Sequence, residues 1–131
     1  MFECWVLYPA RREIDSETTI QWPKKLESNC RWMTSVCTGA FLLAGSGIAQ
    51  GRRRANHHRF IEQLNGLGRT EVVEGIRFLR DGNLVSAGGV MSGIEMSLWL
   101  IQQLWGAARV AEVKVYFAYD CPPRERADLE N

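Results

Sequence analysis

The chain has 131 residues, of which 46% are apolar and 24% are charged, so residues 1–131 are predicted to form a single domain with a hydrophobic core. Sixteen basic and fifteen acidic residues give a formal net charge of +1, which argues against general electrostatic binding of nucleic acid or an anionic membrane. Five Trp, five Phe and three Tyr exclude a disordered chain, and the longest apolar runs are far shorter than the ~20 residues of a membrane span.

The cysteines and histidines do not form a metal-binding pattern. No CxxC pair occurs among Cys4, Cys30, Cys37 and Cys121, and the two histidines are adjacent, so the sequence predicts no zinc site and no metal. A chain of this apolar content needs no disulfides, and it opens without the basic and apolar segments of a secretory signal. We therefore expect free thiols, no cofactor and a cytoplasmic location.

The first predicted elements are a strand and a helix. Residues Cys4–Tyr8 are apolar, aromatic and β-branched, which predicts a strand. Asp15 or Ser16 can cap a helix over Glu17–Asn29, and Pro23 predicts a kink or a break in it because proline lacks the backbone N–H. The inner side of this helix is predicted to carry Ile20, Trp22 and Leu26.

The next segments continue the alternation of strand and helix. Arg31–Val36 predicts a second strand, and the apolar run that follows predicts a helix over Ala40–Ala49. A short strand over Arg52–Ala55 precedes a helix over His57–Leu64, which Asn56 can cap. Short strands are then predicted over Glu71–Val73, Ile76–Arg80 and Leu84–Ala87, with Asp81-Gly82-Asn83 as the turn between the last two.

A long helix follows the tight turn at Gly88-Gly89. It is predicted to open at Ser92 or Gly93, to reach Trp105 and to end at Gly106. Its apolar positions recur with the helical period and predict an inner face made of Ile94, Leu98, Ile101 and Leu104. A last helix covers roughly 107–119, and residues 120–131 read as a polar tail. The recurrence of strand, turn and helix predicts an α/β fold with a mostly parallel sheet.

Cys37 stands where a strand of β-forming residues runs directly into a helix. A side chain at that junction lies at the carboxyl end of the sheet, where open α/β folds bind ligands, and at a helix amino terminus, which favours a thiolate. The N–H of Thr38 could face a developing oxyanion, and Gly39 allows close backbone approach behind the cysteine. Spacing alone leaves open that Cys37 is only a small buried apolar residue.

Two groups of motifs carry a family resemblance. The segment W-x-T-S-V-C-T-G-A-F-L-L-A contains Cys37, and G-x-x-x-G-R-R and then His57 follow it, with the histidine twenty residues after the cysteine. The second group is Asp81-Gly-Asn83, Ser86-Ala-Gly88-Gly89-Val90 and Gly93-Ile94-Glu95. In this order the motifs resemble the ThiJ/PfpI superfamily (class I glutamine amidotransferase-like). The C-T-G context is similar to its isocyanide hydratase branch and to the amidase-like domains of AraC-type regulators.

The resemblance spans roughly Asp15 to Pro123 and implies both a fold and a site. The fold would be a flavodoxin-like three-layer α/β sandwich. Cys37 would be the nucleophile, with Thr38 and His57 as further catalytic residues. Gly39, Gly88 and Gly89 would supply the backbone of the substrate and oxyanion pocket. In an isocyanide hydratase the thiolate attacks the terminal carbon of an isonitrile, water adds, and an N-formamide leaves.

The sequence departs from the family pattern near its start. The family carries an acidic residue that serves as the general acid beside the cysteine, and no Asp or Glu of this chain matches it. The glycine-rich turn that helps to bind the oxyanion reads Pro9-Ala10-Arg11 here, and proline has no N–H to donate. We therefore expect a fold truncated at its amino-terminal side, with exposed strand edges that a partner covers or that leave the protein poorly stable.

Three functions stay open at this point. The first is a cofactor-free, cysteine-dependent hydratase or hydrolase acting on a small molecule, and the second is a non-catalytic ligand-sensing or interaction domain of the regulator type. The third is an inactive fragment. A homodimer is expected, with no membrane contact. Nucleic-acid binding by Arg52–Arg54 is disfavoured, since three arginines in a neutral protein are too few for a footprint.

Overall fold

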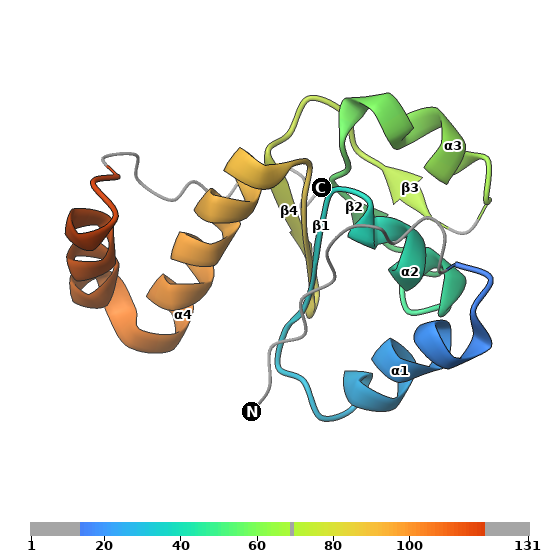
Figure 1. Ribbon diagram of the computed structural model, residues 1–131, viewed down its shortest axis with the longest axis horizontal. Coiled ribbons are helices and arrows are strands. Elements are labelled where there is room, and N and C mark those ends of the chain that lie inside the picture. Colours follow the sequence, from blue (N-terminus) through green and yellow to red (C-terminus); the bar gives the residue numbers. More distant parts are fainter. Residues whose placement is uncertain (1–13, 69, 120–131) are drawn as a thin grey trace.

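The computed structural model describes residues 14–68 and 70–119. The predicted strand over Cys4–Tyr8 and the polar tail 120–131 lie outside the described residues. Figure 1 shows helix α4 on one side of the strands and helices α1, α2 and α3 on the other, so the described part has three layers. Within it, no helix combines the length and the apolar character needed to cross a membrane.

Helix α1, Glu17–Glu27, begins at the predicted cap, because the Ser16 side chain accepts a hydrogen bond from the Thr19 backbone N–H at 3.4 Å. The expected break at Pro23 is wrong: the helix continues through the proline, whose ring is buried. Packing of the ring compensates for the backbone hydrogen bond that proline cannot donate. Ile20 packs against Leu42, whereas Trp22 is 50% exposed, so the inner face excludes the tryptophan.

The main sheet has the strand order β1-β5-β4, built from β1 (Met33–Val36), β5 (Leu84–Ala87) and β4 (Phe78–Asp81). β1 and β5 are parallel, and β4 and β5 form an antiparallel hairpin at the predicted turn. Gly82 in this turn has φ +62°, a left-handed conformation that glycine adopts without steric penalty. A second, parallel pair joins β2 (Arg53–Arg54) to β3 (Glu71–Val72).

Two predicted helices are shorter than the sequence suggested. Helix α2 covers Gly39–Gly45 rather than Ala40–Ala49, since the chain leaves the helix before Gly47, which has φ +82°. The predicted helix over His57–Leu64 is a 3₁₀ turn, η1 (His58–Phe60), followed by α3 (Ile61–Asn65). His57 caps this segment instead of Asn56.

Helix α4, Val90–Tyr116, consists of two halves that Gly106 separates with φ +83° and ψ 173°. The chain reverses there, so that the second half lies outside the first (Figure 1). The break at Gly106 agrees with the prediction, but the helix starts earlier, because Gly89 is the N-cap.

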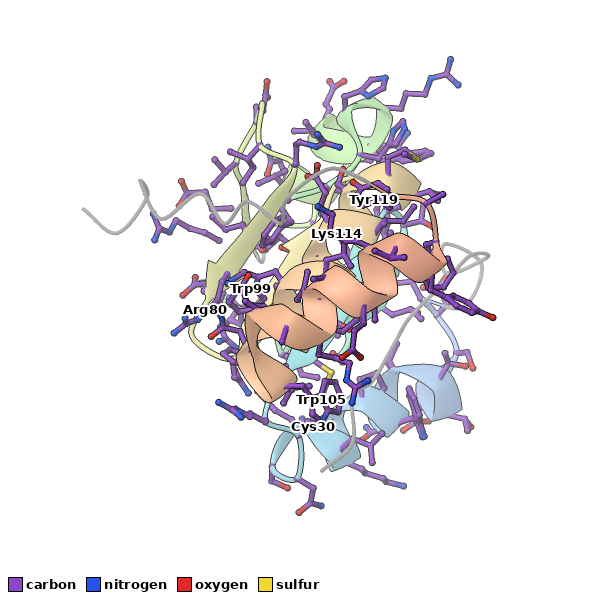
Figure 2. All side chains as sticks on the ribbon, turned by 90° about the vertical axis from the view of Figure 1, so that its left-hand side faces the viewer. Cys30, Arg80, Trp99, Trp105, Lys114 and Tyr119 are labelled. Atoms are coloured by element: carbon purple, nitrogen blue, oxygen red, sulfur yellow. The ribbon has the colours of Figure 1, made fainter. Side chains whose placement is uncertain are left out.

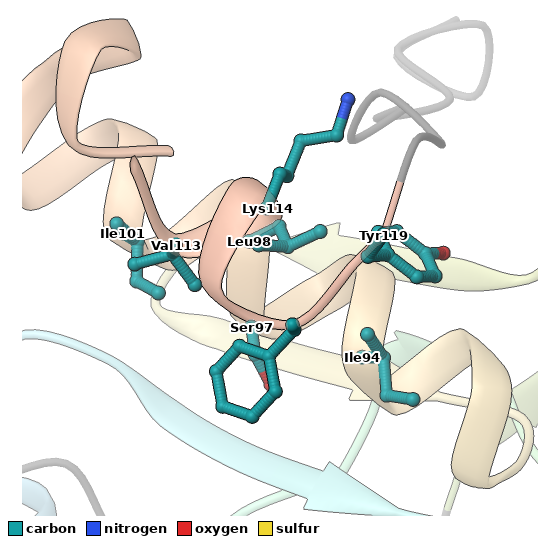
Figure 3. A pocket seen from close by; sticks show the side chains of 8 residues that line it. Ile94, Ser97, Leu98, Ile101, Val113, Lys114 and Tyr119 are labelled. Atoms are coloured by element: carbon teal, nitrogen blue, oxygen red, sulfur yellow. The ribbon is translucent and has the colours of Figure 1, made fainter. Parts of the chain in front are cut away.

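The inner face of α4 is rotated from the one predicted. Its buried contacts to the sheet are made by Met96, Trp99 and Leu100 against Val36, Phe78 and Val85. Ile94 is 38% exposed. The sequence therefore predicted the helical period correctly but chose the wrong face as the one that packs on the sheet. Leu98 and Ile101 point instead toward the second half of α4 (Figure 3).

Candidate active site

Cys37 occupies the turn between β1 and α2 in a strained conformation. Its φ is +53°, a left-handed value that costs a non-glycine residue about 1–3 kcal/mol. The Cys37 N–H donates to the Ala87 carbonyl at 3.0 Å, which continues the β1–β5 ladder up to the turn. The Cys37 carbonyl accepts from the Ala40 N–H at 3.2 Å, which starts α2. The two bonds hold the residue from both sides, so its half-buried side chain stands at the end of the sheet.

A cleft of about 630 Å³ opens beside this turn at the carboxyl ends of β1 and β5. This is where open α/β sheets bind ligands. Four segments line it: the turn between β1 and α2, the segment at the start of α3, the loop before β4, and the turn that leads into α4. Its lining residues are Cys37, Asn56, His57, His58, Ile61, Gly75, Ile76, Arg77, Gly88, Gly89, Val90, Met91 and Ser92.

The glycine pair allows two walls of the cleft to approach each other. The Gly88 N–H donates to the Arg77 carbonyl at 2.9 Å, and a Cβ on Gly88 would lie 3.2 Å from the Asn56 carbonyl oxygen. A Cβ on Gly89 would meet Cδ2 of His57 at 3.5 Å, which is an ordinary contact. Gly88 is therefore the residue whose missing side chain lets the His57 segment lie against the end of β5.

His57 is half-buried in the cleft and stacks on His58 with ring centroids 4.3 Å apart. Its Nδ1 accepts a hydrogen bond from the Arg59 backbone N–H at 3.3 Å. Desolvation, followed by repulsion from His58 and Arg59, lowers the pKa of His57 below the ordinary value of 6.5. The ring is therefore neutral at pH 7, and because Nδ1 is the acceptor, its proton lies on Nε2 as a donor.

The structure brings Cys37, His57, Gly88 and Gly89 together in one cleft, as the sequence predicted. Thr38 and Gly39 do not line it; both are buried directly behind the cysteine. The Thr38 carbonyl accepts from the Phe41 N–H at 3.0 Å, and its hydroxyl has no hydrogen-bond partner among the described residues. A contribution of these two residues to the site would come from the backbone.

Sequence reasoning did not assign four polar residues of the cleft to the site, Asn56, His58, Arg77 and Ser92. Nη1 of Arg77 lies 2.7 Å from Oε1 of Glu95, a carboxylate that is 1% exposed. The Asn56 side chain is buried, and neither its Oδ1 nor its Nδ2 has a hydrogen-bond partner in the part of the chain that is described. Glu95 belongs to a motif that was recognised, but its pairing with Arg77 depends on the tertiary fold and leaves no local signal.

The side chain of Arg54 holds the first turn of α2 by a hydrogen bond to its backbone. Its side chain is fully buried, and its Nη1 donates to the Ala40 carbonyl at 2.6 Å. Burial without a carboxylate partner lowers the pKa of Arg54 to about 10, so the guanidinium keeps its charge at pH 7. Ala40 in turn donates to Cys37, and a buried cation is thus connected to the strained turn through two hydrogen bonds.

A second cavity of about 370 Å³, which we name the α4 groove, lies between the two halves of α4. Figure 3 shows Ile94, Leu98 and Ile101 of the first half and Val113 of the second half around it. Lys114 and Tyr119, on the outer layer in Figure 2, complete the wall. The lining is mostly apolar and contains no cysteine or histidine, so the groove has neither a thiol nor an imidazole base.

Nowhere in residues 14–68 and 70–119 do three or more His, Cys, Asp or Glu side chains gather as a metal-binding group. The polar residues that line the cleft supply a thiol (Cys37), two imidazoles (His57 and His58), a guanidinium (Arg77), an amide (Asn56) and a hydroxyl (Ser92), beside the backbone of Gly88 and Gly89. This set suits nucleophilic attack by sulfur on a small molecule that is held by hydrogen-bond donors.

Comparisons with known proteins agree with this arrangement. The family model described as "DJ-1/PfpI family" matches residues 9–103. An isonitrile hydratase of Pseudomonas putida is 34% identical over 110 residues, which are 84% of this chain and 47% of that protein. The transcriptional regulator CdhR of Pseudomonas aeruginosa is 29% identical over 98 residues, 75% of this chain and 29% of the regulator. The chain therefore spans about half, or less, of the length of these relatives.

Among solved structures, a ThiJ/PfpI family protein from Pseudomonas syringae superposes with a TM-score of 0.80 at 20% identity. The superposition covers 95% of this chain and 52% of that one. At this identity the likeness concerns the fold, and it confirms the predicted flavodoxin-like α/β architecture.

Proposed function

Because the chain belongs to the DJ-1/PfpI family, we propose that it is a cysteine-dependent hydratase-like enzyme with Cys37 as the nucleophile. The observation that carries the proposal is the backbone of Cys37, a non-glycine residue at φ +53° that opens onto the cleft. Strain of this kind persists where the surrounding structure holds it, and it clusters at functional sites. Ala118, outside the cleft, is the other non-glycine residue with positive φ in the described chain.

The proposed reaction adds water to an isonitrile. The Cys37 thiolate forms a bond to the terminal carbon, and that carbon takes a proton, which gives a thioimidate. Water then adds to the same carbon, the C–S bond breaks, and the electron pair returns to sulfur as an N-formamide is released. No carboxyl side chain lines the cleft among the residues described, so the proton comes from solvent or from another chain.

The neighbouring groups have positions that support this chemistry. His57 lines the cleft with its Nε2–H as a donor, and on the glycine wall the backbone donor is the Gly89 N–H, because the Gly88 N–H is bonded to the Arg77 carbonyl. Donors of this kind stabilise charge that develops on the nitrogen or oxygen of a reacting group. Thr38 and Gly39 would act through the backbone that positions Cys37.

Hydration of a simple aryl isocyanide tests the proposal directly. We expect the wild-type protein to form the N-formamide, Cys37→Ser to show the uncatalysed rate, and Cys30→Ser to retain activity. Cys30 is a matched control because it is a free cysteine buried in the core, away from the cleft. Equal rates for the wild type and Cys37→Ser would reject the enzyme.

Labelling with iodoacetamide at pH 6 gives a second test that needs no substrate. Trypsin cleaves after Arg31 and Arg52, so the peptide 32–52 contains Cys37 as its one cysteine and can be followed by mass spectrometry. An activated thiolate reacts faster than the thiols of Cys30 and Cys121. If Cys37 is labelled no faster than Cys121, it is not an activated nucleophile.

A second candidate function, a ligand-binding module without turnover, is favoured by the absence of a carboxyl group from the described lining of the cleft. The relative CdhR is named as a transcriptional regulator. This candidate predicts that small molecules bind in the cleft and protect Cys37 from labelling, with no product formed. Cooperative thermal unfolding of a compact species would separate both candidates from an inactive fragment.

We keep a homodimer and a cytoplasmic location as parts of the proposal. Support for a second copy comes from the outer half of α4, where Val115, Tyr116 and Phe117 are 70–86% exposed. Apolar groups in such numbers are typical of contact surfaces. Light scattering of the wild type and Tyr116→Asp tests the dimer: the wild type should have twice the mass of the variant, and equal masses would reject it.

A further inference from the structure

Arg77 is the one arginine or lysine that lines the cleft, and no acidic side chain lines it among the described residues. Among its lining residues, Cys37 aside, the titratable or charged groups are His57, His58 and Arg77, and no Asp or Glu contributes. Arg59 is next to His58 and adds a further positive charge nearby. The pKa of His57 is lowered first by desolvation and then by His58 and Arg59, and only these two smaller contributions reflect positive charge nearby.

The backbone and one guanidinium nitrogen of Arg77 are held in place, while its side chain stays accessible at the cleft. Its carbonyl accepts from the Gly88 N–H at 2.9 Å, and Nη1 pairs with Oε1 of Glu95 at 2.7 Å. The carboxylate is buried in α4, whereas the arginine side chain is 57% exposed. The ion pair therefore places its positive end outward, at the wall of the cleft.

A guanidinium has five N–H donors in a planar fork that matches a carboxylate. Within the described chain, Glu95 is the one side chain that pairs with Arg77. The side chain as a whole is 57% exposed, so it is accessible to a ligand in the cleft. The amino end of α4, at Val90, Met91 and Ser92, lines the same wall and adds backbone N–H groups to the positive side.

We propose that the cleft takes a small electrophile that carries a carboxylate, with Arg77 as the residue that binds the carboxylate while the reactive carbon faces Cys37. This inference rests on the proposed function for the attack by sulfur, and it adds the substrate class and a specificity-determining residue. A cleft of about 630 Å³ has the size of a small-molecule site. In the hydratase reaction, the simplest product of this class is N-formylglycine.

Binding of that product tests the anion site without any chemistry. In Cys37→Ser, which lacks the thiol, N-formylglycine and its neutral amide are titrated while the imidazole resonances of His57 and His58 are followed by NMR. The anion should bind more tightly than the amide, and raised ionic strength should remove the difference. Equal binding of the two, or binding of neither, would overturn the proposal.

Substitution of Arg77 must respect its buried partner. Arg77→Gln alone removes the cation that faces the buried carboxylate of Glu95, and loss of one partner of a buried ion pair destabilises a fold strongly. The double variant Arg77→Gln/Glu95→Gln removes both charges and avoids that effect. It should lose the preference for the anion, whereas Arg109→Gln, which breaks an exposed ion pair with Glu112 on the outer half of α4, should keep it.

The alkylation rate at Cys37 gives a second readout. Iodoacetate and iodoacetamide both form a C–S bond and release iodide, and they differ in charge. The ratio of the two rates at Cys37 should exceed that of N-acetylcysteine and should fall roughly two- to fivefold in the double variant, the size of an exposed ion pair. A ratio equal to that of N-acetylcysteine would reject the anion site.

The two proposals fail in different ways. If N-formylglycine binds selectively but Cys37 is inert toward both reagents, the anion site stands and the hydratase is rejected. If Cys37 reacts rapidly but without preference for the anion, the nucleophile stands and the substrate class is rejected.

Discussion

The cleft beside Cys37 and the α4 groove are both cavities of ligand size, yet they are built differently. The groove, about 370 Å³, lies between regular helices and is lined by apolar side chains at helical spacing. The cleft, about 630 Å³, lies where strands end and helices begin, and it contains the strained Cys37 and the buried amide of Asn56. Chemistry gathers at the junctions of elements because their backbone groups are not consumed by regular hydrogen bonding.

The largest expected contrast between the two sides of α4 is in stability. Trp99 is 3% exposed and packs edge-to-face on Trp32, with ring centroids 5.4 Å apart, whereas Trp105 is 64% exposed. Trp99→Ala should lower the free energy of unfolding by about 3–5 kcal/mol, and Trp105→Ala by less than about 0.5 kcal/mol. Urea denaturation measures both. Similar losses would show that the outer half of α4 is packed as tightly as the core.

Adding one carbon atom should lower the free energy of unfolding at the cleft wall and leave it nearly unchanged at the α4 groove. A Cβ on Gly88 would lie 3.2 Å from the Asn56 carbonyl, so Gly88→Ala should lower the free energy of unfolding by about 1–2 kcal/mol. It should also slow the labelling of Cys37, because the wall that carries His57 must move. Val113→Ile adds a methylene beside the groove and should change stability by less than about 0.5 kcal/mol. A neutral Gly88→Ala would contradict the tight fit of the two walls.

Glycine substitution should relieve similar backbone strain at Cys37 and at Ala118, but only the change at Cys37 should abolish the hydration activity. Cys37 and Ala118 have φ of +53° and +51°, and glycine adopts this conformation without steric penalty. Cys37→Gly and Ala118→Gly should each raise the free energy of unfolding by about 0.5–1 kcal/mol, as the relieved strain exceeds the entropy that glycine loses. The first variant loses hydration activity and the second keeps it. Thermal unfolding combined with the isocyanide assay measures both effects, and a destabilised Cys37→Gly would refute the strain.

The smallest expected effect concerns protonation of His57. Its pKa in the folded protein is lowered below 6.5, first by desolvation and then by His58 and Arg59. The folded state therefore binds fewer protons than the unfolded chain below pH 6.5, and stability falls as the pH drops from 6.5 through the lowered pKa. Since the ring is only half-buried and solvent screens it, the change is slight. NMR titration should find that Arg59→Gln raises the pKa of His57, and an unchanged pKa would exclude the electrostatic contribution.

Local sequence predicted most elements and the central members of the site. Ser16, the Asp81–Asn83 turn and Gly106 have geometric roles that their residue types impose, and two residues that the motifs single out, Cys37 and His57, line one cleft. These positions depend on backbone conformation within a few residues.

The features that sequence did not reveal depend on contacts between distant segments. Pro23 stays within α1 because its ring is buried, and the inner face of α4 is set by the sheet on one side and its own second half on the other. Arg77 enters the cleft from an irregular segment before β4 and is fixed by Glu95 from α4. No periodicity or motif within either segment encodes that meeting.

The three consecutive arginines 52–54 have a consequence for how the short pair β2–β3 finds its alignment. Arg54 is fully buried and Arg53 is not, yet a slip by one residue would present an identical side chain at each place. The three identical side chains therefore cannot specify the register of β2 against β3, and the residues that flank them must do so. Ala55 is fully buried, with its N–H on Oγ of Ser86 at 2.9 Å, and Gly51 has φ +67°. An arginine would be too large for the position of Ala55 and strained at the positive φ of Gly51. These two small residues on either side of the three arginines therefore fix the register of β2.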